Sequence, residues 1–296
     1  MNKSQKDSTN KIKLTLGKFF FKSLLKLGVR NFVAKLGIDE TKLADYFVKQ
    51  FVNEDGIYEI EGFKLKKGRT TRLPILTGEI EPSQTDLMKK IVKPSMNVFD
   101  LGANFGWFTL VLSKLVGSSG QVYSFEADPY LVNILEENVK LNNFSNISIQ
   151  PIAVSNKTGT SKFSLNEFYD TRSQLDSISH SKNTIDVKIT SLDDFCLKEN
   201  LKKVDLIKMD IEGSELKTLE GMRKIILDNP HLKIITEFNQ TAMLSVGSSP
   251  ECMIDFLLEA GFIIEEIDEK TPGKLKKISK EKLLEKKVCN CYCYKI

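Results

Sequence analysis

The chain has 296 residues, of which 41% are hydrophobic and 28% are charged, and its formal net charge is +4. This balance is typical of a folded globular protein, and the length allows one large domain with an extension. No apolar run reaches the roughly 18 residues that a spanning helix needs, which argues against an integral membrane protein, and the mild charge gives no reason to expect nucleic acid.

Residues 1–55 are predicted to form a helical extension that is basic and amphipathic. Between Lys11 and Leu36 the segment has seven basic residues and no acidic one. Four of them recur at a spacing of four and share one helix face: Lys18, Lys22, Lys26 and Arg30. Such a helix could bind peripherally to an anionic membrane surface. The alternative is a helix that caps the main domain and keeps its lysines solvated.

Residues 56–80 are predicted to connect this extension to the main domain, residues 81–296. The stretch IYEIEGFKLKKG alternates between apolar and polar residues, which is typical of a β-hairpin. The next stretch, PSQTDLMKKIVKP, predicts a helix that Ser83 caps and that ends before Pro94.

Beyond residue 96, strands and helices alternate. The predicted strands are NVFDLG, QVYSFEAD, ISIQPIAVS, VDLIKMDIEG and LKIITEFN, and a single helix, SELKTLEGMRKIILDN, follows the fourth. This alternation predicts an α/β fold with a doubly wound, mostly parallel sheet. FIIEEID and KVCNCYCYKI, separated by a lysine-rich loop, predict a final antiparallel pair.

Ligands of such sheets bind beyond the carboxyl ends of the strands, so the turn FDLGANFGWFTL lies at the expected site. Gly102 lets the backbone approach a ligand, and Gly106 lets a helix begin tightly. The spacing G-x-x-x-G differs from the G-x-G-x-x-G that holds a pyrophosphate. Asp100 would repel a diphosphate but attract an ammonium group, which favours S-adenosylmethionine.

A second acid, Glu126, ends the next predicted strand, where a carboxylate can accept both ribose hydroxyls. The alternative is an ordinary acid near a helix N-terminus, although Asp128 already fills the cap position before Pro129. Ala153, at the end of the third predicted strand, could border the adenine.

The stretch KMDIEGSE places three acids after the fourth strand. Strand alternation predicts that Lys208, Asp210 and Glu212 lie on one side of the strand. Glu215 can be explained as an acid in the first turn of a helix, where it compensates the helix dipole. Asp210 or Glu212 could accept a proton from a hydroxyl, and Glu237, which ends the fifth strand, is a further candidate. The number of carboxylates alone would allow a metal, but no third ligand stands at a telling spacing, and none is predicted.

From about residue 79 to 268 the sequence resembles the FkbM-type methyltransferases, a branch of the class I S-adenosylmethionine-dependent enzymes. The resemblance is carried by FDLGANFGWFTL, VYSFEADPYLVNILEENVKLN, IQPIAVSNKTGTSKFSL, SLDDF and VDLIKMDIEGSELKTLEGM. The family commonly has proline where this chain has Ala127, a change that leaves Glu126 in place. The resemblance implies a seven-stranded Rossmann-like sheet with an antiparallel last strand, and methyl transfer to an oxygen of a sugar or other small metabolite.

The resemblance also implies roles for individual residues. Asp100, Gly102, Asn104 and Gly106 would line the methionine side of the cofactor, Glu126 would hold its ribose, and Asp210 and Glu212 would face donor and acceptor. It does not cover residues 1–55.

The same residues bear on other functions and partners. A nicotinamide-dependent oxidoreductase is disfavoured by the missing glycine motif, and a nucleic-acid methyltransferase by the acidic loop after the fourth strand. A membrane-associated binding protein without enzymatic activity is the remaining alternative. Residues 167–186 form a polar segment that could be a lid with Tyr169, Arg172 and His180, or an exposed loop. Five cysteines without a disulfide framework favour a cytoplasmic location, with peripheral contact at the inner membrane face possible through the basic helix.

Overall fold

The computed structural model describes residues 48–49, 51–68, 75, 77–165, 174–175 and 184–296. The chain divides into two compact units, Met1–Ile80 and Glu81–Ile296. Two predicted groups of side chains lie outside the described residues: the basic helix face (Lys18, Lys22, Lys26 and Arg30) and the candidate lid (Tyr169, Arg172 and His180). Their roles, and the predicted domain boundaries, stay predictions.

In the first unit, two short strands form the hairpin that the sequence pattern predicts. Strands β1 (Ile57–Ile60) and β2 (Phe63–Lys66) pair antiparallel. Glu61 and Gly62 join them with φ values of 49° and 83°, and two-residue hairpin turns favour such positive values because they match the twist of the strands. Alternate side chains of both strands are buried, so the hairpin has one apolar face.

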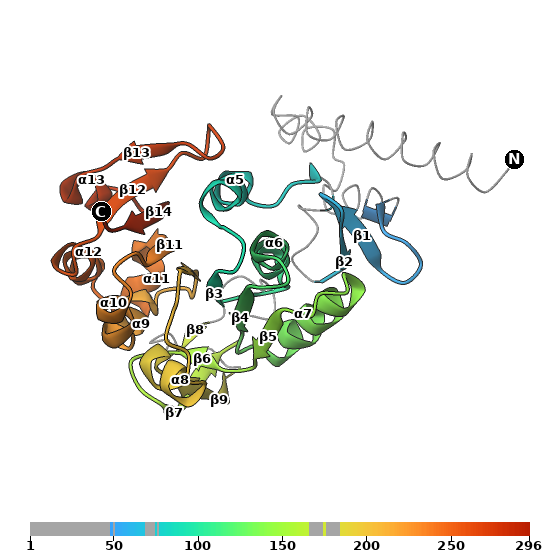
Figure 1. The fold of residues 1–296 in the computed structure, drawn as a ribbon, viewed down its shortest axis with the longest axis horizontal. Coiled ribbons are helices and arrows are strands. Elements are labelled where there is room, and N and C mark those ends of the chain that lie inside the picture. The colour runs from blue at the N-terminus through green and yellow to red at the C-terminus, as the bar shows by residue number, and fades with distance from the viewer. Residues whose placement is uncertain (1–47, 50, 69–74, 76, 166–173, 176–183) are drawn as a thin grey trace, which may run out of the picture. The chain divides into compact units, whose positions relative to one another are not determined.

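The second unit is built on an eight-stranded sheet whose centre is parallel (Figure 1). Its strands lie in the order β13 (Leu275–Lys277), β12 (Ile263–Ile267), β14 (Val288–Tyr294), β11 (Lys233–Asn239), β10 (Leu206–Met209), β3 (Asn97–Leu101), β4 (Gln121–Phe125) and β5 (Ile147–Gln150). Strand β14 runs antiparallel to β11 and β12, which confirms the predicted last strand. The strand order reverses between β3 and β10, so the ligand crevice is expected beyond their carboxyl ends.

Seven of these strands are the predicted ones, and the eighth, β13, is not. It lies with helix α13 (Lys280–Leu284) in the lysine-rich segment that the sequence analysis predicts to be a loop. The physical reason is that β13 is a strand of three residues at the edge of this sheet, where it pairs with β12. Lysines suit such an edge because they keep it from pairing with other chains, but they hide the strand from a pattern of apolar residues.

Helices connect the strands and cover the sheet. They are α5 (Pro82–Ile91), α6 (Trp107–Val116), α7 (Pro129–Leu141), α8 (Leu192–Lys198), α9 (Glu215–Glu220), α10 (Arg223–Asp228), α11 (Gln240–Ser245) and α12 (Pro250–Glu259). Helix α5 leads into β3, and the indole N–H of Trp107 donates to the hydroxyl of Thr85 (3.1 Å), which ties α6 to α5.

Helix α5 begins differently from its prediction. The cap position is Glu81, with φ 40°, and its side chain makes no capping hydrogen bond. Ser83 does not cap the helix, because it is buried within the first turn and its hydroxyl donates to the carbonyl of Asp268 (3.2 Å). Pro82 at the first turn fixes the earlier start, since proline fits there without losing a hydrogen bond.

Two predicted elements are interrupted. The predicted strand ISIQPIAVS divides at Pro151 into β5 and β6 (Ala153–Val154), because proline has no N–H for a ladder. The predicted helix after β10 divides into α9 and α10 at Gly221, where a Cβ would lie 2.2 Å from the carbonyl oxygen of Ser155. Strand β6 joins a four-stranded sheet in the order β6, β9 (Thr184–Thr190), β7 (Gly159–Ser164) and β8 (Gln174–Leu175), so part of the predicted lid segment is strand.

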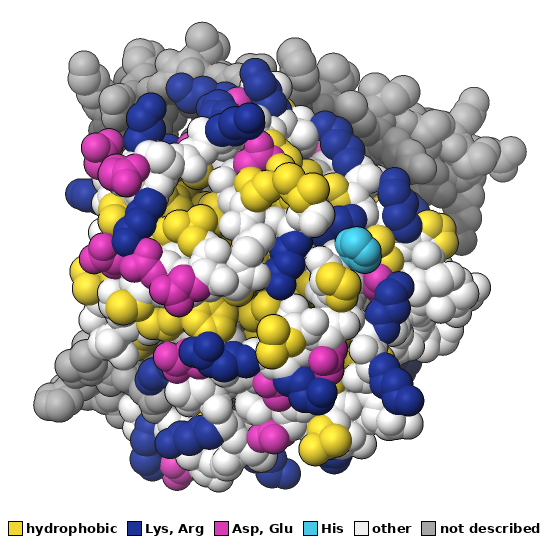
Figure 2. All heavy atoms as spheres, turned by 60° about the vertical axis from the view of Figure 1, so that its left-hand side comes forward, with side chains coloured by type: hydrophobic (Ala, Val, Ile, Leu, Met, Phe, Trp, Pro, Cys, Tyr) yellow, Lys and Arg dark blue, Asp and Glu magenta, His cyan; other side chains and the backbone are white. Residues whose placement is uncertain are grey.

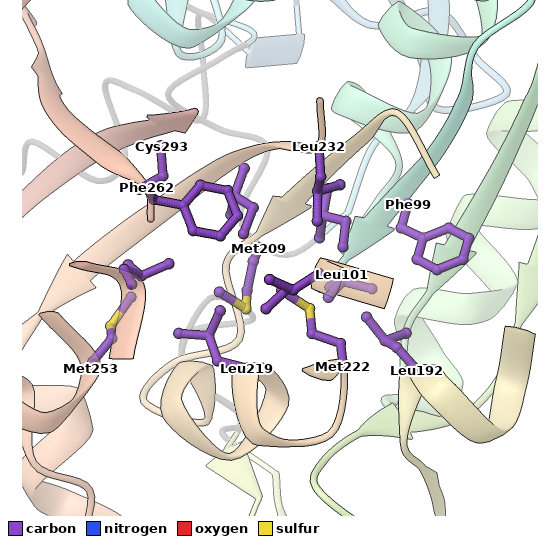
Figure 3. Close-up of a cluster of buried hydrophobic side chains, with 14 of the residues drawn as sticks. Phe99, Leu101, Leu192, Met209, Leu219, Met222, Leu232, Met253, Phe262 and Cys293 are labelled. Carbon is purple, nitrogen blue, oxygen red and sulfur yellow. The ribbon is translucent and has the colours of Figure 1, made fainter. Parts of the chain in front are cut away.

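One face of the large sheet buries the main core (Figure 3). Phe99 and Leu101 of β3 and Met209 of β10 contribute to it, with Leu219 and Met222 from the helical segment that follows β10. All five side chains are fully buried. Because protein cores are close-packed, this packing fixes the two strands whose carboxyl ends form the expected crevice.

The three cysteines of β14 are buried: Cys289, Cys291 and Cys293. On the face drawn in Figure 2, lysine and arginine side chains are interspersed with acidic and apolar ones, so the positive charge does not form one continuous field there. Within the described part of the chain, no helix combines the length and the apolar character that a bilayer crossing requires.

Candidate active site

The turn between β3 and α6 packs against the ends of two neighbouring strands. Gly102 and Gly106 have φ values of 75° and 92°, a left-handed backbone that glycine adopts without strain. The N–H of Gly102 donates to the carbonyl of Phe125 (3.0 Å), and the N–H of Asp210 donates to the carbonyl of Leu101 (3.1 Å). A Cβ at Gly102 would lie 1.9 Å from the carbonyl oxygen of Asp210. The close backbone approach at Gly102 is therefore to the loop after β10.

Glu126 ends β4 and holds the tip of this turn. Its Oε2 accepts from the N–H of Asn104 (2.8 Å), and its Oε1 accepts from the N–H groups of Ala127 and Asp128 (both 2.9 Å). Since a carboxylate has about four accepting positions, one position on Oε2 remains for a ligand hydroxyl. Asp128 accepts from the N–H of Tyr130 (2.8 Å), which confirms the predicted cap of α7.

Burial changes the proton affinity of Glu126, which is 7% exposed. It raises the pKa of the carboxyl to about 7, while the N–H bonds of Asp128 and Asn104 oppose the rise because they favour the ionised form. Near neutral pH the group is therefore present in both forms, and a ligand that donates hydroxyl hydrogen bonds to it favours the ionised one.

Asp100, the predicted partner of a cofactor ammonium, lies on β3 with no exposed surface. Its Oδ2 accepts from the hydroxyl of Thr109 (2.6 Å), and its Oδ1 lies 3.9 Å from Nζ of Lys208. Burial raises the pKa of this carboxyl above its ordinary value, and the charge of Lys208 opposes the rise. Direct contact of Asp100 with a cofactor ammonium stays a prediction. The burial of Asp100 favours an indirect role, in which its carboxylate holds Lys208 in place.

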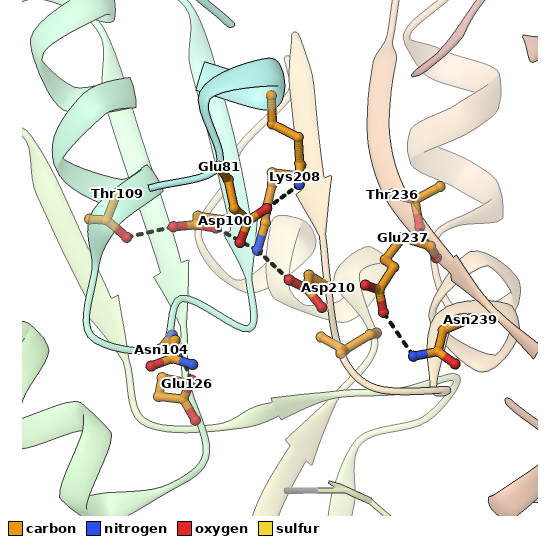
Figure 4. Close-up of polar contacts among 12 residues, drawn as sticks. Glu81, Asp100, Asn104, Thr109, Glu126, Lys208, Asp210, Thr236, Glu237 and Asn239 are labelled. Atoms are coloured by element: carbon orange, nitrogen blue, oxygen red, sulfur yellow. Dashed lines mark hydrogen bonds and ion pairs between the residues drawn. The ribbon is translucent and has the colours of Figure 1, made fainter. Parts of the chain in front are cut away.

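Lys208 places a buried positive charge among these carboxylates (Figure 4). The residue is 3% exposed, and its Nζ lies 3.4 Å from Oδ2 of Asp210 and 5.0 Å from the ring centroid of Phe108. Burial alone would lower its pKa, but the charges of Asp210, Asp100 and Glu81 outweigh burial and raise it. Lys208 therefore stays protonated and cannot serve as a base.

The predicted proton acceptors come from the ends of β10 and β11. Asp210 directly follows β10, and its side chain is 30% exposed. Glu237 is half-buried on β11, and its Oε2 accepts from Nδ2 of Asn239 (3.1 Å). Burial, followed by the charge of Asp210, raises the pKa of Glu237. Figure 4 shows the carboxyl groups of Asp210 and Glu237 facing each other.

Glu212 is placed by a turn and not by strand alternation. Strand β10 ends at Met209, and Glu212 lies three residues beyond it with φ 51°. The alternation that predicts a common side for Lys208, Asp210 and Glu212 therefore does not extend to Glu212. Its catalytic role stays a prediction.

Glu81 belongs to the same group of carboxylates, and sequence reasoning misses it. Figure 4 shows its carboxyl directed toward Asp100 and Lys208. The side-chain amide of Gln84 donates to its Oε2. Burial of the carboxyl and the charge of Asp210 raise its pKa to about 7. An acid before a proline and a serine looks like an ordinary helix start, so only the three-dimensional arrangement indicates a place in the site.

Glu215 is more than an exposed acid in a first helical turn. It is 1% exposed, and its Oε1 accepts from the N–H of Ile211 (3.2 Å), while its Oε2 has no hydrogen-bond partner in the described structure. Burial raises its pKa to about 7. At Gly213 a Cβ would lie 2.4 Å from the carbonyl oxygen of Ala242, so the loop after β10 is held from two sides.

Ala153, the predicted adenine neighbour, lies on β6 and pairs with Ile189 of the small sheet. It packs against a cluster that contains Phe163 and Val187. Ala127, which follows Glu126, packs against the same cluster, and the adenine role of Ala153 stays a prediction. Among the described residues, no group of three or more His, Cys, Asp or Glu side chains is arranged to hold a metal ion.

The sheet order and the carboxylates at the reversal point define a doubly wound α/β protein with its candidate site at the carboxyl edge. Residues 100–264 match the model of the methyltransferase FkbM domain, and the chain belongs to this family. The membership confirms the family predicted from the sequence motifs and confirms S-adenosylmethionine as the cofactor. It does not favour the oxidoreductase or the non-enzymatic alternative.

Curated relatives and solved structures extend the comparison. The chain is 26% identical over 157 residues to Methyltransferase 1 of Beauveria bassiana, which covers 47% of this chain and 61% of that protein. It is 42% identical over 62 residues to a ribosomal protein L11 methyltransferase of Caldanaerobacter subterraneus, covering 21% and 19% of the two chains. A solved S-adenosylmethionine-dependent O-methyltransferase of Thermotoga maritima shares 15% identity over 82% of this chain and 78% of that one, with a TM-score of 0.44.

Proposed function

We propose that this protein transfers the methyl group of S-adenosylmethionine to a hydroxyl group of a small molecule or glycan. The family match over residues 100–264 carries the proposal. The matched span includes both the turn after β3 and the acid that ends β4, which are the predicted cofactor-binding elements. The carboxylates beyond β10 and β11 support it further, because an acidic crevice attracts a cofactor that carries an ammonium and a sulfonium group.

The chemistry of the residues in the turn fits this cofactor. We infer that Glu126 accepts one ribose hydroxyl at the remaining position of Oε2, because its Oε1 is already occupied by two N–H groups. Gly102, Asn104 and Gly106 shape the turn beside the methionine part. Asp100 acts indirectly by holding Lys208, and Ala153 borders the adenine.

When bound, S-adenosylmethionine supplies an electrophilic methyl group. The protein must orient the acceptor hydroxyl and receive its proton. Asp210, Glu212 and Glu237 are the acceptors proposed from the sequence. Of these, Asp210 lies 3.4 Å from the ammonium of Lys208 and forms an ion pair with it.

Titration calorimetry with S-adenosylmethionine tests the cofactor part of the proposal. We expect saturable binding to the folded protein, clear weakening in Glu126→Ala, and unchanged binding in Glu136→Gln, whose side chain is exposed on α7. Folded protein that shows no binding would sink the proposed function, and a Glu126→Ala variant that binds as well as the wild type would remove the ribose assignment only.

The acceptor class needs a second experiment. Extracts of small metabolites and soluble glycans are incubated with the protein and S-adenosylmethionine labelled in its methyl group. We expect a labelled product that survives mild base, because a methyl ether is stable there whereas a methyl ester releases methanol. Label that is released by base, or found only in nucleic acid added to the mixture, contradicts a hydroxyl acceptor. Peripheral membrane contact through the basic helix stays a separate prediction.

A further inference from the structure

Glu81 reaches the site from an element that precedes the family-matched span, which begins at residue 100. Helix α5 leads into β3, and β3 starts at the amino edge of the sheet, so the N-terminus of α5 lies toward the carboxyl edge. The left-handed backbone of Glu81 (φ 40°, ψ 60°) directs its side chain toward Asp100 and Lys208 (Figure 4). The amide of Gln84 donates to its Oε2 and holds the carboxyl in this direction.

The other charged groups of the cluster are committed to partners or buried. Asp100 has no exposed surface, and a substrate hydroxyl cannot touch it without rearrangement of β3. Asp210 is paired with the ammonium of Lys208 at 3.4 Å. Glu237 is half-buried on β11 and accepts from the amide of Asn239.

Glu81 differs from these groups in its access to solvent. The residue is exposed, while its carboxyl points toward Asp100 and Lys208 (Figure 4). Four charged groups from other elements face it: Lys208 and Asp210 from β10 and its end, Glu237 from β11 and Glu269 after β12.

We propose that Glu81 is a catalytic residue that accepts the proton of the acceptor hydroxyl during methyl transfer. The inference rests on the proposed function and adds to it a residue outside the family-matched span. As the acceptor oxygen forms its bond to the methyl carbon, the bond from that carbon to the donor sulfur breaks and leaves its electron pair on sulfur. The hydroxyl proton passes to a carboxyl oxygen of Glu81, so one positive and one negative charge disappear together.

The electrostatic surroundings suit this role. Burial raises the pKa of Glu81 to about 7, and the negative charges of Asp210, Glu237 and Glu269 act in the same direction, while Lys208 opposes them. A base is most effective when its pKa lies near the working pH, so a carboxyl with this value can both take up and release a proton near neutrality. The rate should therefore rise with pH and level off above about 7.

The test compares Glu81→Gln with two variants. Asp86→Asn is the matched control, because Asp86 lies on the same helix and its carboxylate pairs with exposed Lys89. Glu237→Gln removes the competing candidate base. Label transfer from S-adenosylmethionine to the metabolite and glycan extract is measured from pH 5.5 to 9, with cofactor binding by calorimetry alongside. We expect Glu81→Gln to bind the cofactor as the wild type does, to transfer roughly 100-fold more slowly, and to lose the rise of rate near pH 7.

Two outcomes would overturn the role of Glu81. One is a wild-type rate in Glu81→Gln, and the other is loss of the pH-dependent rise in Glu237→Gln but not in Glu81→Gln. The carboxyl ¹³C resonance of Glu81 gives a readout that is independent of turnover, and its absence in Glu81→Gln assigns it. We expect this resonance to titrate with a midpoint near 7. A midpoint near the ordinary 4.5 contradicts the proposal. If the wild type itself transfers no label, the proposed function fails, and the resonance still decides on Glu81.

Discussion

At the scale of single residues, Gly102 shows how closely the loops of the site approach one another. Its φ of 75° strains any residue with a side chain, and a Cβ there would meet the carbonyl oxygen of Asp210 at 1.9 Å. Gly117, at the end of α6, has a similar φ of 67° but nothing within 4 Å of its Cβ position. A comparison of Gly102 with Gly117 therefore distinguishes the cost of an unfavourable backbone conformation from the cost of a steric contact.

Gly102→Ala should lose more stability than Gly117→Ala. Gly117→Ala is expected to cost about 1–3 kcal/mol for its backbone conformation alone (φ 67°, ψ −175°), whereas Gly102→Ala adds a contact that only backbone movement relieves and should cost more than Gly117→Ala. Urea denaturation of both variants measures the difference. Equal losses would contradict the close contact between the loops after β3 and β10.

The burial of Lys208 can be predicted from the sequence, but the acids that surround it cannot. LIKMD places Lys208 inside an apolar strand, which signals a charge that needs partners. Which partners it has depends on the pairing of β3 with β10, a contact between residues more than 100 positions apart. Glu81 carries no comparable signal, because its place in the site follows from the direction in which α5 enters the sheet.

At the scale of elements, the end of β4 fixes the turn that begins α6. The carboxyl of Glu126 accepts three backbone N–H groups, and all its partners belong to the turn or to the start of α7. An amide in its place would direct an NH₂ group toward at least one N–H donor. The geometry of the turn between β3 and α6 therefore depends on an acid at this position and not only on a polar side chain.

Glu126→Gln should loosen this turn. We expect a loss of about 1–3 kcal/mol of unfolding free energy, because one backbone donor is left without its acceptor. Amide hydrogen exchange at Asn104, Ala127 and Asp128 should accelerate. Asp128→Asn is the matched control, since asparagine caps a helix as well as aspartate does. Exchange that stays at the wild-type rate in Glu126→Gln would show that these N–H groups do not depend on the carboxylate.

The order of elements could be read from the sequence because buried parallel strands are continuous apolar runs. Strands β3 and β10 at the centre of the sheet follow that pattern, with burial along almost their whole length. Interruptions could not be placed in the same way: Pro151 moves the end of the third predicted strand into another sheet, and Gly221 divides a helix where the backbone of Ser155 lies close. Both breaks result from contacts with distant segments, which a local pattern does not contain.

At the scale of the whole molecule, several buried carboxyls link stability to pH. Burial raises the pKa of Glu126 and of Glu215 to about 7, from an ordinary value of 4.5. Between these values the folded protein binds more protons than the unfolded chain. The free energy of unfolding is therefore highest below about pH 4.5 with respect to these groups, and it falls as the pH rises through about 7.

Glu215→Gln should flatten this dependence. For one such group the difference between 4.5 and about 7 corresponds to about 3 kcal/mol, so the variant should be less sensitive to pH between 5 and 8 and at least as stable as the wild type at pH 8. Glu259→Gln, an exposed position on α12, should follow the wild-type curve. Urea denaturation at each pH measures both, and an unchanged slope in Glu215→Gln would contradict a carboxyl that is protonated in the folded state.

The contacts of Gly102 with Asp210 and of Gly213 with Ala242 have a consequence for redesign. Backbone meets backbone at both points, so the loops that form the floor of the site leave no room for new side chains. Altered acceptor preference must then come from side chains of neighbouring elements. A library aimed at a new acceptor would keep the two glycines, Glu81 and Glu237, and vary other residues at the start of α5 and the end of β11.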